Sequence, residues 1–271
     1  MPDQKQYSRR EILRLGAGSL LALGLWPGSL RAAEKGQSGD FSFLVVNDIH
    51  YVDGHCGDWL QGVLCKMRNH PEHPDFCVIA GDLAENGTAA QFTAVRDLFK
   101  TLGIPVFCVP GNHDYVTFTE RKPYEQIFPN SLNYQFEHKG WQFVALDTTQ
   151  GQTAFPTQIQ APTLGWVDDT LPGLDKTRPT VILTHFPLGP GVVVRPTNAD
   201  LLLDRFRDYN LQAAFSGHWH GFTEGHIREA TLTTNKCCSF RSHNHDGTIE
   251  KGYFLCRAKD GMVSRVFVQV G

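Results

Sequence analysis

Residue types that bind metals and transfer protons occur in five short motifs along the chain. The motifs are Asp48-Ile49-His50, Gly81-Asp82, Gly111-Asn112-His113-Asp114, His185 and Gly217-His218-Trp219-His220. Each follows an apolar, strand-like run, so that its oxygen or nitrogen donors can converge on one pocket. Two divalent cations about 3.5 to 4 Å apart, held by such donors and a bridging carboxylate, activate a water molecule and bind phosphate oxygens. The motifs together predict a two-metal site for the hydrolysis of phosphate esters.

The spacing within the motifs supports this interpretation more than any single motif does. Asp48 and His50 lie two residues apart at a predicted strand end, where the chain leaves its pleat and both side chains can reach one point. His218 and His220 have the same spacing. Asp82 is the candidate bridging carboxylate. A lone Asp-x-His or Gly-Asp pair occurs often by chance, whereas five motifs in order after five strand candidates do not.

The first half of the chain alternates strand and helix patterns. Three apolar runs are typical of buried strands, at residues 41–46, 76–80 and 105–109. Helices are predicted at about 58–69 and, from a capping box formed by Thr88 and Gln91, at 88–102. Three motifs therefore stand at the carboxyl ends of strands, where an open α/β sheet binds its ligands.

The second half is richer in strands. We expect a hairpin of residues 133–137 and 141–147, strands at 180–184 and 213–215, a helix at 198–209, and antiparallel strands at 231–234, 237–241, 252–258 and 263–270. This pattern predicts two sheets packed face to face with helices outside. Residues 41–271 would form one domain, preceded by a linker at 34–40.

Residues 1–33 differ from the rest and predict an export signal. Ser8-Arg9-Arg10-Glu11-Ile12-Leu13 precedes an apolar run from Leu15 to Trp26, which is too short and too rich in glycine for a comfortable membrane span. The segment resembles a twin-arginine signal, with Ala32-Ala33 near the expected cleavage site. We therefore expect a periplasmic or secreted protein without an integral membrane domain; an uncleaved signal that anchors the chain is the alternative.

Charge and cysteine content narrow the function further. Without residues 1–33 the chain keeps 20 basic and 26 acidic residues, a net charge of −6, which argues against nonspecific binding of nucleic acid. The expected partner is a small phosphoester. Seven cysteines without Cys-x-x-Cys spacing argue against a zinc ribbon, and Cys77 and Cys108 are expected to be buried apolar residues. Disulfide pairing and oligomeric state stay open.

From about residue 41 to its end, the chain resembles the calcineurin-like metallophosphoesterase superfamily, because all five motifs are present. The resemblance implies a four-layer α/β/β/α sandwich with two mixed sheets. It also implies two sets of metal ligands, which are Asp48, His50, Asp82 and His220 for one metal and Asp82, Asn112, His185 and His218 for the other. Such donors without cysteine suit manganese, iron or zinc.

The same resemblance suggests roles for the two remaining polar residues of the third motif. His113 would protonate the leaving oxygen while a metal-bound hydroxide attacks phosphorus, and Asp114 would orient the His113 ring. The segment Gly81-Asp82-Leu83-Ala84-Glu85-Asn86-Gly87 lacks the arginine that protein Ser/Thr phosphatases carry there. Glu85 also stands where purple acid phosphatases have a metal-binding tyrosine. The motifs are nearest to class III cyclic-nucleotide phosphodiesterases and glycerophosphodiesterases.

Two other functions stay open from the sequence. The chain could be a noncatalytic binding module on this fold, or its metal site could only stabilise the fold. Outside the motifs, His55, His243 and His245 are expected in exposed loops or turns. Arg195 and Arg241 are weaker candidates for contacts with a phosphate.

Overall fold

The structure, a computed structural model, describes residues 39–271, so the predicted export signal and most of the predicted linker lie outside the described residues. Within that range, none of the helices is long and apolar enough to cross a membrane.

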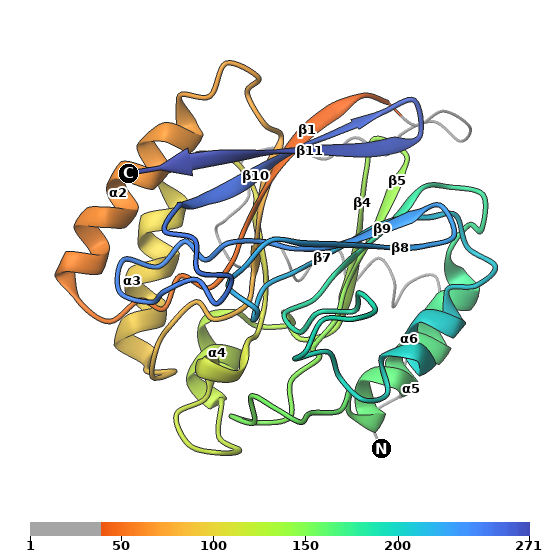
Figure 1. Cartoon of the computed structure of the whole chain (residues 1–271), viewed down its shortest axis with the longest axis horizontal. Coiled ribbons are helices and arrows are strands. Elements are labelled where there is room, and N and C mark those ends of the chain that lie inside the picture. Colours follow the sequence, from red (N-terminus) through yellow and green to blue (C-terminus); the bar gives the residue numbers. More distant parts are fainter. Residues whose placement is uncertain (1–38) are drawn as a thin grey trace, which may run out of the picture.

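Two mixed sheets form the centre of the fold (Figure 1). The first, called the β1 sheet, has the strand order β11-β10-β1-β2-β3, and the second, called the β6 sheet, has the order β4-β5-β6-β7-β9-β8. The strands of the β1 sheet are β1 (Phe41–Val46), β2 (Phe76–Ala80), β3 (Val106–Val109), β10 (Lys251–Lys259) and β11 (Met262–Val270). Those of the β6 sheet are β4 (Tyr134–His138), β5 (Trp141–Ala145), β6 (Thr180–Leu183), β7 (Leu211–Ser216), β8 (Thr223–Ile227) and β9 (Ala230–Thr234).

Helices cover the outer face of each sheet, so the predicted four-layer α/β/β/α sandwich with two mixed sheets is confirmed. On the β1 sheet lie α2 (Gly54–Arg68), α3 (Ala89–Lys100) and α4 (Lys122–Ile127). On the β6 sheet lie α5 (Ala161–Thr170) and α6 (Ala199–Arg205). Figure 1 shows α2 and α3 on one side of the molecule and α5 and α6 on the other. Two single turns of 3-10 helix, η2 (Asn112–Asp114) and η3 (Leu171–Gly173), complete the elements.

The alternation of side chains along β1 shows why two cores form. Phe43 and Val45 point into the core between the sheets, whereas Leu44 and Val46 point toward the helices on the outer face. The inner core is largely aromatic, with the rings of Phe43 and Phe76 stacked at 5.0 Å. Because both faces of β1 are buried, its register is fixed. The position of the Asp48-Ile49-His50 motif that follows β1 is therefore fixed as well.

The predicted strands that form agree with the structure to within about two residues at either end in both sheets, whereas other details differ. The Thr88 hydroxyl caps α3 by accepting from the Gln91 amide at 3.4 Å, but the Gln91 side chain accepts from the Asn86 amide instead of closing the capping box. The strand predicted at 237–241 is wrong, because Ser239 accepts hydrogen bonds from the amides of Arg241 and Ser242 in a turn. Helices α4 and α5 and strand β8 were not predicted.

Candidate metal centre

Five strands bring the motifs to one end of the sandwich. The predicted ligands follow the carboxyl ends of β1, β2, β3, β6 and β7, and these five strands run parallel within their sheets. Because parallel strands end on the same side of a sheet, residues far apart in the sequence meet there. Six of the seven predicted ligands are buried and His218 is partly buried: Asp48, His50, Asp82, Asn112, His185, His218 and His220.

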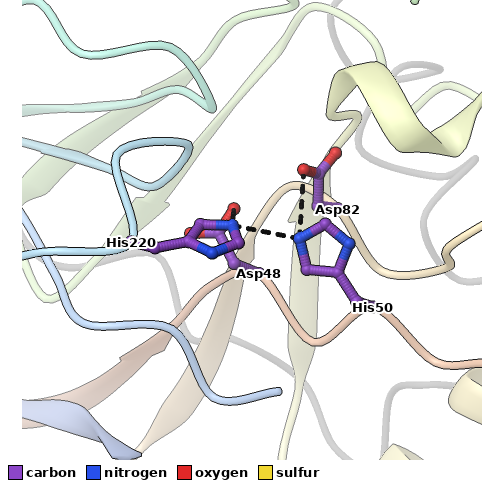
Figure 2. A group of neighbouring side chains, drawn as sticks. All are labelled: Asp48, His50, Asp82 and His220. Atoms are coloured by element: carbon purple, nitrogen blue, oxygen red, sulfur yellow. Dashed lines mark hydrogen bonds and ion pairs between the residues drawn. The ribbon is translucent and has the colours of Figure 1, made fainter. Parts of the chain in front are cut away.

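One cluster contains Asp48, His50, Asp82 and His220, whose donor atoms all lie within 4.8 Å of one another (Figure 2). The Nε2 atoms of His50 and His220 are 3.0 Å apart. Oδ1 of Asp48 lies 3.3 Å from Nε2 of His220, and Oδ2 of Asp82 lies 3.5 Å from Nε2 of His50. The four donors thus surround one point, as the ligands of a single cation do.

A second cluster contains Asp82, His185 and His218. Oδ2 of Asp82 lies 3.4 Å from Nε2 of His185, and Oδ1 of Asn112 lies 3.2 Å from the same nitrogen. Asp82 belongs to both clusters, which is the position expected of a bridging carboxylate. The structure therefore brings the seven predicted ligand residues into two adjoining groups of donors.

The hydrogen bonds of the histidine rings show that these residues fit metal ions. Nδ1 of His220 donates to the carbonyl of His243 at 3.0 Å, and Nδ1 of His185 donates to the carbonyl of Ala80 at 3.0 Å. Nδ1 of His50 lies 2.7 Å from a carboxylate oxygen of Glu85. Each Nε2 is then left as an acceptor that faces other acceptors, and only a cation or added protons can hold such atoms together.

The pKa values of the histidines indicate that both donor clusters favour positive charge. Burial would lower the pKa of His185, but the carboxylate of Asp82 outweighs it and raises this pKa to about 9. Burial also opposes the charged form of His220, yet Asp48 raises its pKa to about 11. Burial lowers the pKa of His218 to about 4, so this ring is a neutral donor. In each cluster a carboxylate thus favours positive charge at the neighbouring imidazole, which a proton or a bound cation can supply.

The backbone at the site is strained where the donors are placed. Five of the seven ligand residues have a positive φ, which Asp, Asn and His adopt more readily than other residues with a side chain: Asp48, His50, Asp82, His218 and His220. The motif glycines allow close approach. A Cβ at Gly81 would lie 2.3 Å from Nδ1 of His185, and one at Gly111 would lie 2.1 Å from Oδ1 of Asp82.

Asp114 does not contact the His113 ring as predicted, whereas His113 itself lies at the metal centre. The His113 ring lies at the edge of the first cluster, 4.6 Å from the His50 ring, and its Nδ1 faces the carbonyl of Glu85 at 3.2 Å. The Asp114 carboxylate is buried and accepts from the amides of Leu83, Ala84 and Gly111. Asp114 thus fixes the loops that carry Asp82 and Asn112, and the carboxylate beside the His113 ring is that of Glu85 at 3.6 Å.

Three residues near the ligands have contacts that the sequence interpretation missed. Glu85 was noted only as a departure from a tyrosine, although its carboxylate holds His50. Nδ2 of Asn47 donates to Oδ2 of Asp48 at 2.5 Å. The exposed ring of His245 lies 5.1 Å from the ring of His220. Asn47 and Glu85 stand beside motifs, so their position along the chain was a usable signal, whereas His245 belongs to a distant turn.

The weaker candidates contact other partners. Arg195 pairs with Asp200 at 2.5 Å, and Arg241 pairs with Asp53. His55 is exposed as predicted but lies in the first turn of α2, not in a loop. Cys77 and Cys108 are buried as predicted. The seven cysteines are free thiols in the structure.

Comparison with known proteins gives the class to which this fold and site belong. Residues 41–222 match the sequence model of the calcineurin-like phosphoesterase family, so the chain belongs to this family. The expectation of a phosphoesterase of this superfamily is thereby confirmed at the level of the family.

The individual proteins that resemble this chain do so at low sequence identity. A probable cyclic nucleotide phosphodiesterase of Synechococcus sp. is 31% identical over 42% of this chain and 43% of its own length. A glycerophosphodiester phosphodiesterase of Enterobacter lignolyticus is 24% identical over 68% of this chain and 69% of its own length. The matched part of the chain thus spans less than half of the first relative. A dimetal phosphatase from Danio rerio has a similar fold, with a TM-score of 0.63 and 15% identity over 85% of this chain and 99% of that one.

Proposed function

We propose that this chain is a dinuclear metal-dependent hydrolase of phosphoric esters, with diesters as its preferred substrates. The observation that carries the proposal is the sharing of Asp82 between two clusters of donors that are buried except for the partly buried His218. Two divalent cations in such a site lower the pKa of a water molecule and polarise a phosphate ester. Manganese, iron and zinc suit the mixture of imidazole, carboxylate and amide donors. The names of the two relatives favour diesters over monoesters.

His113 is the residue we assign to proton transfer to the leaving oxygen. Its Nδ1 faces the carbonyl oxygen of Glu85, which can only accept, so Nδ1 carries a proton in either charge state of the ring. Nε2 is therefore the atom that gains and gives up the transferable proton. The carboxylate of Glu85 lies 3.6 Å from Nδ1 and stabilises the charged ring from behind. The side chain is 39% exposed, so a substrate can reach it.

The test compares a diester and a monoester on one preparation of the full chain. The protein is stripped with a chelator, reloaded separately with Mn²⁺, Fe²⁺ or Zn²⁺, and assayed with bis(p-nitrophenyl) phosphate and p-nitrophenyl phosphate. We expect two bound metal ions per chain and faster turnover of the diester. Two bound metal ions without turnover of either ester would favour a metal site that only stabilises the fold. Failure to bind metal would favour the noncatalytic binding module.

We also propose that residues 1–33 direct export through the twin-arginine pathway. The support is the sequence Ser8-Arg9-Arg10 followed by a short apolar run. The test is cell fractionation of the full chain beside a variant with Arg9→Lys and Arg10→Lys. Equal amounts of both proteins outside the cytoplasm would contradict the proposal. A shift to lower mass after export would distinguish cleavage from an anchoring, uncleaved signal.

A further inference from the structure

The two oxygens of the Asp48 carboxylate have different partners. The backbone amide of His218 donates to Oδ1 at 3.1 Å and to Oδ2 at 3.0 Å. Nδ2 of Asn47 adds a second hydrogen bond to Oδ2 only, at 2.5 Å, whereas Oδ1 faces Nε2 of His220 at 3.3 Å. Because donors crowd Oδ2, Oδ1 is the oxygen left to face a metal ion. The hydrogen bond from Asn47 therefore decides which oxygen of Asp48 is presented to the first cluster.

Asn47 is itself held by a part of the chain that is distant in sequence. The residue is 0% exposed, and its Nδ2 also donates to the carbonyl of Asn235 at 3.2 Å. Its own carbonyl accepts from the amide of Cys238 at 3.1 Å. Both partners belong to residues 235–250, which join β9 to β10 and which we call the β9–β10 segment. The orientation of Asn47 thus depends on this segment.

The β9–β10 segment supports a second ligand of the first cluster. Nδ1 of His220 donates to the carbonyl of His243 at 3.0 Å, and the amide of His245 donates to the carbonyl of His220 at 3.1 Å. Asp48 follows a strand of the β1 sheet, whereas His220 follows a strand of the β6 sheet. One segment therefore holds ligands that come from both sheets.

A buried amide inside the segment keeps these contacts together. The side chain of Asn244, which is 8% exposed, accepts from the amide of Cys237 at 3.0 Å. It also donates to the carbonyls of Thr248 at 3.2 Å and Glu250 at 2.8 Å. A buried network whose members are paired in this way is rigid. Asn244 thus joins the two ends of the β9–β10 segment.

The histidines of the second cluster are held by other parts of the chain. Nδ1 of His185 donates to the carbonyl of Ala80 at 3.0 Å, at the end of β2. Nε2 of His218 lies 3.0 Å from the carbonyl of Ala154, in the loop between β5 and α5. A change in the β9–β10 segment should therefore affect the first cluster and spare the second.

We propose that Asn47 is a positioning residue for Asp48, and that the β9–β10 segment sets the metal affinity of the first cluster alone, through Asn47 and His220. The proposal rests on the metal centre of the proposed function and assumes nothing about the ester. Residues that support metal ligands change metal affinity by roughly 10- to 100-fold. The loss of the Asn47 hydrogen bond should fall in this range.

The first test is calorimetric titration of the chelator-stripped full chain with Mn²⁺. In Asn47→Ala, we expect one site to bind Mn²⁺ roughly 10- to 100-fold more weakly and the other to keep its affinity. Asn47→Ser keeps a hydrogen-bond donor of shorter reach, so its loss should be smaller. Unchanged affinities in Asn47→Ala, or equal weakening of both sites, would overturn the proposal. Equal losses in Asn47→Ala and Asn47→Ser would overturn the role of the hydrogen bond.

Gln142→Ala is the control for the loss of a buried amide. Gln142 is 1% exposed and exchanges hydrogen bonds with the backbone of Asp175. It lies opposite Thr180 at the start of β6, whereas the ligand His185 follows the end of that strand. The variant should melt at a lower temperature and keep both Mn²⁺ affinities. Selective weakening of one site in Gln142→Ala would overturn the specific role of Asn47.

Double variants assign the weakened site. His220→Ala removes a donor from the first cluster only, and His185→Ala removes one from the second only. Adding Asn47→Ala to His185→Ala should weaken the remaining site roughly 10- to 100-fold. Adding it to His220→Ala should change the remaining affinity by less than about twofold, because the cluster that Asn47 serves is already lost. The reverse pattern would overturn the proposal.

Asn244→Asp tests the segment and keeps the experiment decisive if Asn47→Ala does not fold. The aspartate has the same size and still accepts from the Cys237 amide, but it cannot donate to Thr248 and Glu250. We expect about tenfold weaker Mn²⁺ binding at the first site and no change at the second. Asn210→Asp, which loses a donor to the carbonyl of Thr177, is the control. Unchanged affinities in Asn244→Asp would overturn the role of the segment.

Ester hydrolysis separates a failure of this proposal from a failure of the proposed function. Two Mn²⁺ ions bound by the wild type, with neither ester hydrolysed, would contradict the proposed function alone. Normal hydrolysis with unchanged Mn²⁺ affinities in Asn47→Ala and Asn244→Asp would overturn the positioning role alone.

Discussion

The two sheets contribute different chemistry to one site. The β1 sheet carries both carboxylates, Asp48 and Asp82, together with one imidazole and the Asn112 amide. The β6 sheet carries imidazoles only, at His185, His218 and His220. Each cluster takes donors from both sheets. Negative charge is thus concentrated on one sheet, while the other supplies imidazole donors, so cations bound here would join the two sheets at this end.

The largest effect is expected from the shared carboxylate of the β1 sheet. Asp82→Asn keeps the size of the side chain but removes the charge that faces both clusters. We expect loss of both metal ions and a fall in turnover of more than about 100-fold, beyond the range of losses from residues that only support a ligand. Elemental analysis and the diester assay measure the two effects. Asp97→Asn, at an exposed carboxylate of α3, is the control. Wild-type metal content in Asp82→Asn would contradict the shared role.

Ligands of the β6 sheet should have separable effects. His220→Ala removes a donor from the first cluster only, and His185→Ala removes one from the second only. Each variant should bind about one metal ion fewer, with turnover lowered roughly 100-fold. Metal titration followed by calorimetry would distinguish the site that is lost. Loss of both metal ions in both variants would show that the clusters act as one site.

Glu85, which supports His50, allows a comparison of how the two sheets hold their histidine ligands. His50, on the β1 sheet, is held by the Glu85 carboxylate, whereas His220, on the β6 sheet, is held by a backbone carbonyl. Glu85→Gln keeps a hydrogen-bond acceptor and removes the charge. We expect metal affinity and kcat to fall by roughly tenfold with KM little changed. Glu125→Gln, at an exposed glutamate of α4, is the control. A change in KM alone would assign Glu85 to substrate binding instead.

The smallest effect is expected where an ion pair joins the sheets outside the metal site. Oδ2 of Asp75 lies 2.7 Å from Nε2 of His138 and 2.7 Å from Nζ of Lys139. Burial alone would raise the pKa of Asp75, but the hydrogen bonds from His138 and Lys139 outweigh it and lower this pKa. Asp75→Asn should cost about 1 kcal/mol, or roughly 2 to 4 °C in Tm.

The pH dependence of that effect has a definite sign. A carboxyl whose pKa is lower in the folded than in the unfolded state stabilises the fold above its unfolded pKa of about 4. This stabilisation is lost as the pH falls through the lower, folded pKa. Thermal melts of the wild type and Asp75→Asn should therefore differ at neutral pH and converge in acid. A difference that grows in acid would contradict the assigned role.

The sequence was informative where local patterns decide the structure. Strands β1 and β2 were predicted at their observed bounds, because buried strands are continuous apolar runs. The ligand motifs could be recognised because each follows such a strand. By contrast, α5 contains Pro162 and Gly165 and has a weak apolar face, and β8 alternates exposed with partly buried residues. These elements depend on packing against distant parts of the chain, which a short stretch of sequence does not reveal.

The role of Asp114 shows the same limit within the site. Its adjacency to His113 suggested a contact between the two side chains. In the 3-10 turn that begins at Asn112, the Asp114 side chain points instead toward the amides of Leu83, Ala84 and Gly111. A motif therefore identified the chemical groups, and the turn geometry decided which partners they contact.

The order of strands in the β1 sheet affects when the metal site can form during synthesis. β1 lies between β2 and β10, with Phe43 opposite Cys256, so an early and a late part of the chain are direct neighbours. During synthesis, β1 has one edge uncovered until β10 leaves the ribosome. The loop that carries Asp48 and His50 follows β1. We therefore expect the first cluster to be completed late in folding, and a nascent chain bearing only the first four motifs to need protection from aggregation.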